Sequence, residues 1–109
     1  MVSKVKEERK IKKKKDKEWA NLVKARDKHC VICKSKIMMN AHHLFPKEIE
    51  GLRWDLDNGL TLCPKHHRFS FQLSAHQNPL AFFLWLWDNR QEQYSKLVNK
   101  YNGLRIIEE

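Results

Sequence analysis

Two pairs of candidate metal ligands constrain this chain more than any other feature of its sequence. Cys30-x-x-Cys33 and Cys63-x-x-His66 each have the spacing at which one tight turn presents two ligands to a zinc ion. Together the pairs use all three cysteines of the chain and complete a four-ligand shell, which leaves no position for a substrate. We therefore predict a structural zinc site that closes a long loop and stabilises the fold. Buried free thiols are the alternative.

The size of the chain makes such a site useful. With 109 residues, of which 41% are hydrophobic, the chain can fill one small core, and a core of this size is marginal without an additional crosslink. Three cysteines cannot all pair with one another, so a disulfide framework is disfavoured. The sequence has no apolar run long enough to cross a membrane, and its first residues lack the pattern of a signal peptide. We therefore expect an intracellular protein in a reducing compartment, without a membrane partner.

Positive charge is concentrated at the N-terminus. The net charge is +9; residues 1–28 carry 12 Lys or Arg against 5 Asp or Glu, whereas residues 29–109 carry 10 against 8. A concentrated cationic segment is typical of proteins that bind a polyanion, most often nucleic acid. We predict that residues 1–18 form a basic arm that frays or remains disordered until it meets phosphate; a solvated tail is the alternative. The DNA contacts expected from this arm are those of Lys12, Lys13, Lys14 and Lys15.

The remainder of the chain predicts a small α+β domain over residues 19–109. Apolar residues at helical spacing from Trp19 onward indicate a helix, and Asn58-Gly59 is typical of a turn before a strand. The expected elements are a helix at 17–27, a metal-binding hairpin at 30–36, strands at 37–44 and 60–62, a loop at 46–58, a short helix from Pro64, and a C-terminal helix at about 79–101.

The C-terminal helix is expected to begin at Asn78-Pro79 and to end near Asn102-Gly103. Its predicted core face consists of apolar residues at helical spacing, namely Leu80, Phe83, Leu84, Trp87, Tyr94, Leu97, Val98 and Tyr101. Phe82 and Trp85 lie off this face. We expect them to form a second buried face, a packing surface for the helix at 17–27, or a contact between two copies in a homodimer.

Three histidines outside the zinc pairs predict a second site. His42 and His43 are adjacent on an expected strand, so their side chains point to opposite faces. His67 projects about 100° from His66 on a helix and so points away from the zinc. We predict a cluster of His42, His43 and His67 beside Asn58, in which two histidines bind a divalent ion and the third takes a proton from water. The histidines beside expected loops receive no role: His29 and His76.

In its order of motifs the sequence resembles the HNH endonucleases, a family with a zinc-bound ββα-metal fold. The resemblance covers about residues 26–72 and is carried by Cys30-x-x-Cys33, Ala41-His42-His43-Leu44-Phe45-Pro46, Asp57-Asn58-Gly59-Leu60-Thr61-Leu62-Cys63 and His66-His67. Arg53-Trp54-Asp55 and the Trp-rich final helix are similar to phage recombination members of the NinG/Rap group. The resemblance implies a DNA substrate and the cytoplasm of a prokaryotic or phage-infected cell.

The resemblance also implies a role for each residue of the second site. His43 would be the general base that activates water. His42 and His67 would be ligands of a catalytic divalent ion such as Mg²⁺, Mn²⁺ or Ni²⁺. Asn58 would order the loop or contact that metal, and His66 would take the place of a fourth zinc cysteine.

Two positions depart from the family pattern. Phe71 stands where some members have a further histidine, and Ser70 stands where a lysine is common. The metal shell is therefore expected to be completed by water and phosphate. Further DNA contacts, flanking the site, are expected from Arg53, Lys65 and Arg68.

Several functions compete for this sequence. The first is a metal-dependent DNA endonuclease that hydrolyses phosphodiester bonds by a one-metal mechanism. The alternative is a non-catalytic zinc-ribbon module that binds DNA, and a third is a protein-interaction domain whose helix presents Trp85 and Trp87. His42, His43 and His67 favour the endonuclease, because a zinc ribbon needs none of them.

Overall fold

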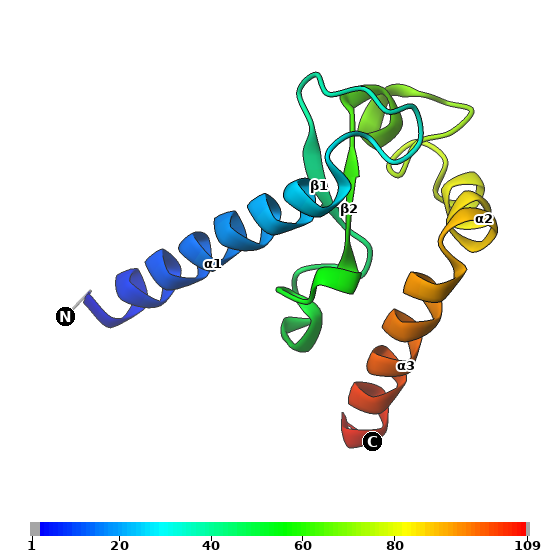
Figure 1. Ribbon diagram of the computed structural model, residues 1–109. Helices are drawn as coiled ribbons and strands as arrows, with labels where there is room; N and C mark the ends of the chain where they lie inside the picture. The colour runs from blue at the N-terminus through cyan, green and yellow to red at the C-terminus, as the bar shows by residue number, and fades with distance from the viewer. Residues whose placement is uncertain (1–2, 109) are drawn as a thin grey trace.

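A two-stranded antiparallel sheet lies at the centre of the molecule, with a long helix on one side and two C-terminal helices on the other (Figure 1). This computed structural model describes residues 3–108, with side chains as far as residue 105. The helices are α1 (Ser3–Asp27), α2 (Pro79–Asn89) and α3 (Gln91–Glu108), and the strands are β1 (Asn40–His43) and β2 (Gly59–Leu62). Single turns complete the order: the 3₁₀ helices η1 (Glu50–Leu52) and η2 (Leu56–Asn58), and the π-helix η3 (Lys65–Phe69). The predicted α+β class is confirmed.

Helix α1 is continuous and includes most of the basic arm, although a helix was expected only from residue 17. Lysine, glutamate and arginine are good helix formers, and the helix contains no glycine or proline. Two ion pairs are among the contacts that hold its basic half against the loop between the strands. Lys12 Nζ lies 2.7 Å from a carboxylate oxygen of Glu50, and Asp16 pairs with Arg53.

The hairpin sets the positions of the histidines. His43 lies opposite Gly59, and every residue of β2 is buried. Strand β1 is shorter than the strand predicted at 37–44, because Met38 is exposed and has a φ of 51°, outside the range of a strand. Gly59 is itself in extended conformation, with a φ of −139°, so the Asn-Gly pair does not form the predicted turn.

Helix α1 packs directly on β2. Trp19 and Val23 are buried, and a Cβ atom added to Gly59 would lie 2.5 Å from Trp19 and 2.8 Å from Val23. The carboxylate of Asp27, at the end of the helix, is buried as well and accepts a hydrogen bond of 2.9 Å from the backbone N–H of Thr61. The glycine is therefore needed for the close approach of helix and strand.

Two helices, not one, form the C-terminal part. Arg90, with φ −134° and ψ 40°, separates α2 from α3. Its guanidinium lies 3.9 Å from Asp27, and the side chain of Gln93 donates a 3.0 Å hydrogen bond to the carbonyl of Gly59. The break between α2 and α3 coincides with these contacts to the end of α1 and to the hairpin. Neither a proline nor a glycine lies at the break. Helix α3 then runs past Gly103, where the helix was expected to end.

The buried face of α2 differs from the prediction. Phe82 and Leu86 face the core, each with 5% of its surface exposed. All four α2 residues of the predicted core face are exposed instead: Leu80, Phe83, Leu84 and Trp87. On α3 the prediction holds at Leu97, which is buried. No described helix is both long and apolar enough to span a membrane.

Candidate metal centres and active site

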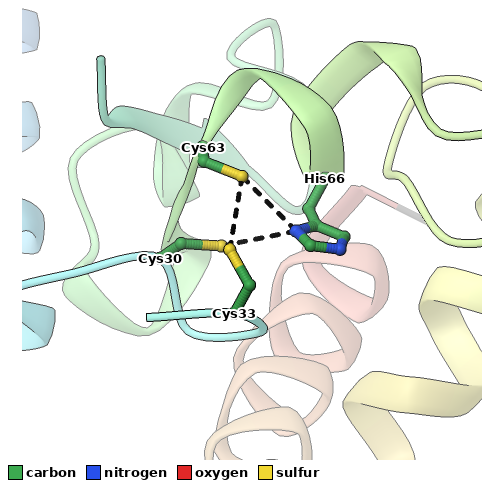
Figure 2. A group of neighbouring side chains, drawn as sticks. All are labelled: Cys30, Cys33, Cys63 and His66. Atoms are coloured by element: carbon green, nitrogen blue, oxygen red, sulfur yellow. Dashed lines mark hydrogen bonds between the residues drawn. The ribbon is translucent and has the colours of Figure 1, made fainter. Parts of the chain in front are cut away.

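Three cysteines and a histidine converge beyond one end of the hairpin (Figure 2). Cys30 and Cys33 lie on the turn after α1, while Cys63 and His66 follow β2. The Sγ atoms of Cys33 and Cys63 are 3.6 Å apart. His66 Nδ1 lies 3.4 Å from Cys63 Sγ and 3.8 Å from Cys30 Sγ. Because tetrahedral ligands at zinc bond lengths of about 2.0–2.3 Å are about 3.3–3.8 Å from one another, this donor set fits a structural zinc ion. The predicted cluster is confirmed.

The three thiols are free. The 3.6 Å between Cys33 and Cys63 is far beyond a disulfide bond length of about 2.05 Å. Burial alone would raise the pKa of the Cys30 thiol, but hydrogen bonds from the surrounding backbone, chiefly that of Cys33, lower this pKa below its usual value. Burial raises the pKa of Cys63. Since zinc binds thiolate, the fold prepares Cys30 better than Cys63 as a ligand.

Three histidines form a second cluster. His42 on β1, His67 on η3 and His76 on the loop before α2 each place one ring nitrogen within 4.8 Å of the others. The Nε2 atoms of His67 and His76 are 3.1 Å apart, and the ring of His42 packs edge-on against Phe82. Imidazole suits zinc, copper, iron and nickel as a ligand. The structure thus brings His42 and His67 together, as predicted, and places His76 rather than His43 beside them.

Burial keeps two rings of this triad neutral. It lowers the pKa of His42 to about 3, and the charges of His67 and His76 add to the effect. It lowers the pKa of His67 to about 4, with further contributions from His76 and Arg68. A neutral imidazole has a free lone pair on one nitrogen. At neutral pH both rings can therefore serve as metal ligands.

His43 points to the other face of β1, toward α1. Its ring stacks on Trp19, with the ring centroids 3.9 Å apart and the planes at 8°. His43 Nε2 is 2.9 Å from the carbonyl oxygen of Arg53, and because a carbonyl only accepts, Nε2 carries the hydrogen. Burial lowers the pKa of His43, which favours the neutral ring. In that ring Nδ1 has the free lone pair.

Asn58 holds the loop between the two strands. It is fully buried, and its Oδ1 accepts a 2.7 Å hydrogen bond from the backbone N–H of Phe45. Its Nδ2 donates to the carbonyls of Phe45 at 3.1 Å and of Leu52 at 3.0 Å. These contacts match loop ordering, one of the two roles that the family resemblance implies.

The basic residues expected to contact DNA fall into two groups. Exposed side chains are those of Lys13, Lys14, Lys65 and Arg68. Others are engaged within the protein: Lys12 with Glu50, Lys15 with the ring of Trp54, and Arg53 with Asp16. The Arg53 side chain is 14% exposed and donates hydrogen bonds of 2.8 and 2.7 Å to Asp16. Its guanidinium therefore anchors the loop, and a phosphate would have to displace Asp16 to reach it.

The segment that carries the zinc cluster resembles a known family of nucleases. Residues 30–70 match the model of the HNH endonuclease family. No curated protein and no solved structure matches the chain. The matched stretch leaves out α1, His76 and the C-terminal helices. A hairpin followed by a turn that carries metal-binding side chains is consistent with the predicted ββα-metal fold, whereas the NinG/Rap subgroup remains a prediction.

His76 is the member of the triad that the sequence did not reveal. It follows His67 by nine residues, in a segment expected to be a loop without a role. Backbone hydrogen bonds fold this segment onto η3: the N–H of Ala75 donates to the carbonyl of His66, and that of His76 to the carbonyl of His67. No local periodicity signals such a return. The one cue was Phe71, which leaves a histidine of the family pattern missing.

Proposed function

We propose that residues 30–70, completed by His76, form a metal-dependent endonuclease site that hydrolyses phosphodiester bonds in DNA. The convergence of His42, His67 and His76 in one cluster is the observation that carries this proposal. A module that uses zinc only for its fold requires no second cluster of ligands. The similarity of residues 30–70 to the HNH endonucleases supports the nuclease class.

The residues of the site divide the chemistry between them. His42, His67 and His76 would hold the divalent ion, which supplies positive charge to stabilise the phosphate and the leaving oxygen. His43 Nδ1 takes a proton from the attacking water, while its Nε2–H remains bonded to the carbonyl of Arg53. His42 and His43 are adjacent at the end of β1 and point to opposite faces of the strand, so a phosphate that reaches both the metal ligands and the base would have to lie across this end of the strand.

Supercoiled-plasmid nicking with Mg²⁺, Mn²⁺ or Ni²⁺ tests this function. We expect the wild type to nick, and the His43→Ala variant to be slower by about 10²- to 10⁴-fold, since it lacks the general base. His76→Ala should require a higher concentration of the divalent ion, because one ligand is lost. His29→Ala, which changes a histidine outside both clusters, is the control and should nick at the wild-type rate. Equal cleavage by wild type and His43→Ala would contradict the base assignment.

A second candidate function is non-catalytic DNA binding by a zinc-ribbon module, and the basic helix α1 is the observation that favours it. Both functions predict binding, so cleavage distinguishes them. If the wild type binds DNA but cleaves neither duplex, single-stranded nor branched DNA with any of the three ions, the second function replaces the first.

Part of the basic surface of α1 is a row of lysines along one side of the helix. Five exposed lysines occur at helical spacing i, i+4, i+7, i+8 and i+11: Lys6, Lys10, Lys13, Lys14 and Lys17. At about 100° per residue they occupy one sector of the helix, opposite the face that buries Trp19 and Val23. We name this set the lysine stripe and propose that it contacts DNA phosphates.

The salt dependence of DNA binding tests the lysine stripe. Each phosphate contact contributes about 0.9 to the slope of log affinity against log salt. Changing Lys13, Lys14 and Lys17 together to Gln should therefore reduce the slope by about 2 to 3. The control variant changes three lysines outside α1 to Gln, namely Lys34, Lys36 and Lys96. Its slope of log affinity against log salt should equal that of the wild type. Equal slopes for the two triple variants would contradict a phosphate role for the stripe.

A further inference from the structure

The candidate base His43 is held by residues that lie outside the stretch matching the nuclease family. Helix α1 contributes Trp19, whose ring is parallel to that of His43 at 3.9 Å. Trp19 is itself fixed, because it is 3% exposed and its Nε1 donates a 2.8 Å hydrogen bond to the carbonyl of Asp55. The plane of the His43 ring is therefore set by a neighbour that cannot easily rotate.

A second constraint acts on the direction of the ring within that plane. His43 Nε2–H points to the carbonyl of Arg53, 2.9 Å away, and this bond selects the tautomer whose Nδ1 is free to accept a proton. The carbonyl belongs to a loop residue, so its position depends on what holds the loop. Without such support, the loop could move and release the ring.

Asp16 of α1 supplies that support. Its two carboxylate oxygens accept hydrogen bonds of 2.8 and 2.7 Å from the Arg53 guanidinium. One of them also accepts a 2.9 Å hydrogen bond from Trp54 Nε1. A single carboxylate thus fixes two successive loop residues, in the bidentate geometry that gives arginine pairs their directional specificity.

We propose that Asp16 and Trp19 are positioning residues for the general base. Trp19 sets the plane of the His43 ring, and Asp16 holds the Arg53 segment whose carbonyl fixes the ring's tautomer. The inference rests on the proposed function of His43 and extends the site to a helix beyond the family-like region. Neither residue touches the DNA or the reacting atoms in this role. Their effect passes through the orientation of His43.

Single-turnover nicking at saturating DNA tests the effect on the chemical step. Asp16→Ala and Trp19→Leu should each lower the rate by about 10- to 100-fold, since a misplacement of about 1 Å can cost 10²-fold. DNA affinity and zinc content should stay at wild-type values. Asp16→Asn, which keeps one acceptor oxygen, and Trp19→Phe, which keeps a stacking ring, should lie between these variants and the wild type.

A matched control tests whether loss of any negative charge on α1 has the same effect. Glu18 is exposed on the same helix, and Glu18→Gln removes one negative charge, as Asp16→Asn does. This variant should nick at the wild-type rate. If Glu18→Gln is as slow as Asp16→Asn, the effect is one of charge on α1, and the positioning role is wrong.

A measurement independent of cleavage uses the ¹⁵N and ¹H signals of the His43 ring at a pH at which the ring is neutral. The wild type should show the Nε2–H tautomer, and Asp16→Ala should show a mixture of both tautomers. A wild-type ring in the Nδ1–H form, or an unchanged tautomer in a folded Asp16→Ala variant, would overturn the proposal. Should Asp16→Ala fail to fold, Asp16→Asn provides the same comparison.

The outcomes separate the two proposals. If His43→Ala nicks like the wild type, the base assignment fails, and the tautomer measurement alone decides whether α1 orients the ring. If His43→Ala is inactive while folded Asp16→Ala and Trp19→Leu nick at the wild-type rate, the base assignment stands and the positioning role is wrong.

Discussion

The side chain of Asn58 determines the course of the loop between β1 and β2. Its amide makes three hydrogen bonds to the backbone of Phe45 and Leu52, and the amide is fully buried. Replacing it by alanine leaves these backbone groups without partners in a site that water cannot easily enter. We expect Asn58→Ala to reduce the free energy of unfolding by about 2–4 kcal/mol, measured by urea denaturation of the zinc-loaded protein.

Asn40 provides the control for this variant. It lies on β1 but is exposed, and its Nδ2 donates a single 3.2 Å hydrogen bond to the carbonyl of Met38. Asn40→Ala should change the free energy of unfolding by about 0.5 kcal/mol or less, as is usual for surface substitutions. A similar loss in both variants would show that burial of the Asn58 amide is not what matters.

Asp27 makes the stability of the fold depend on pH. Burial would raise its pKa, but hydrogen bonds from Arg26 and from the backbone N–H of Thr61 outweigh burial and lower the pKa below 3.8. The carboxylate therefore stabilises the folded state above the unfolded pKa and loses this contribution as the pH falls through the lower folded pKa. We expect Asp27→Asn to be less stable than the wild type by about 1–3 kcal/mol at pH 7.

The same reasoning fixes how this difference changes with pH. From pH 7 to about pH 5 the gap between the two unfolding free energies should stay constant, because Asp27 is ionised in both states of the wild type. Below 3.8, the ordinary pKa of an aspartate, the gap should narrow. Both proteins carry the same zinc ligands and histidines, so loss of metal in acid largely cancels in the comparison. A gap that widens in acid would contradict the assigned direction.

At the scale of elements, the junction between α1 and β2 depends on a glycine. A Cβ atom on Gly59 would meet Trp19 and Val23 at 2.5 and 2.8 Å, closer than real Cβ contacts, and both side chains are buried. Because such overpacking displaces a helix or a strand, we expect Gly59→Ala to cost about 1–3 kcal/mol of stability, measured by thermal or urea unfolding. It should also slow nicking, since Trp19 stacks on His43.

Gly103 is the matched control for this substitution. It lies within α3, and an added Cβ atom would meet nothing within 4 Å. Alanine loses less conformational entropy than glycine in a helix, so Gly103→Ala should stabilise the protein by about 0.5–1 kcal/mol. We expect the free energy of unfolding to fall in Gly59→Ala and to rise in Gly103→Ala. A fall of equal size in both variants would argue against the packing at Gly59.

Several elements could be predicted from the sequence because their signals are local. Cys30-x-x-Cys33 and Cys63-x-x-His66 depend on the spacing of one turn each, and the structure brings the four side chains together. The face of α2 could not be predicted in this way. Both Leu84 and Leu86 are apolar, so periodicity does not decide which of them is buried when nearly every position of the helix is hydrophobic.

The remaining differences between the predicted site and the site in the structure arise from contacts between segments that are distant in the sequence. His76 joins His42 and His67 only because the loop before α2 folds back onto η3. Arg53 was expected to contact phosphate because it is basic and lies near the site, but Asp16, 37 residues earlier, binds its guanidinium. Neither contact has a signature within a window of neighbouring residues.

At the scale of the whole molecule, the zinc cluster connects parts of the fold that otherwise share little core. Cys30 and Cys63 are themselves members of the main hydrophobic cluster, which contains only four other buried residues: Leu60, Leu62, Phe82 and Leu86. Helices α1 and α3 extend away from the hairpin in different directions, so much of their length lies apart from this cluster (Figure 1). A zinc ion held by this tetrad would therefore replace part of the apolar core that a chain of this size lacks.

Removing zinc should consequently unfold the domain. We expect a strong chelator under reducing conditions to abolish the near-ultraviolet circular dichroism of the aromatic core and the cooperative thermal transition, and added Zn²⁺ to restore both. Cys63→Ala should behave like the chelated protein. His66→Cys should still bind one zinc, because thiolate and imidazole both serve in tetrahedral sites. The cooperative thermal transition is measured for all four variants and conditions. A chelated protein that keeps this transition would show that the apolar core suffices alone and that the tetrad is not the crosslink of this fold.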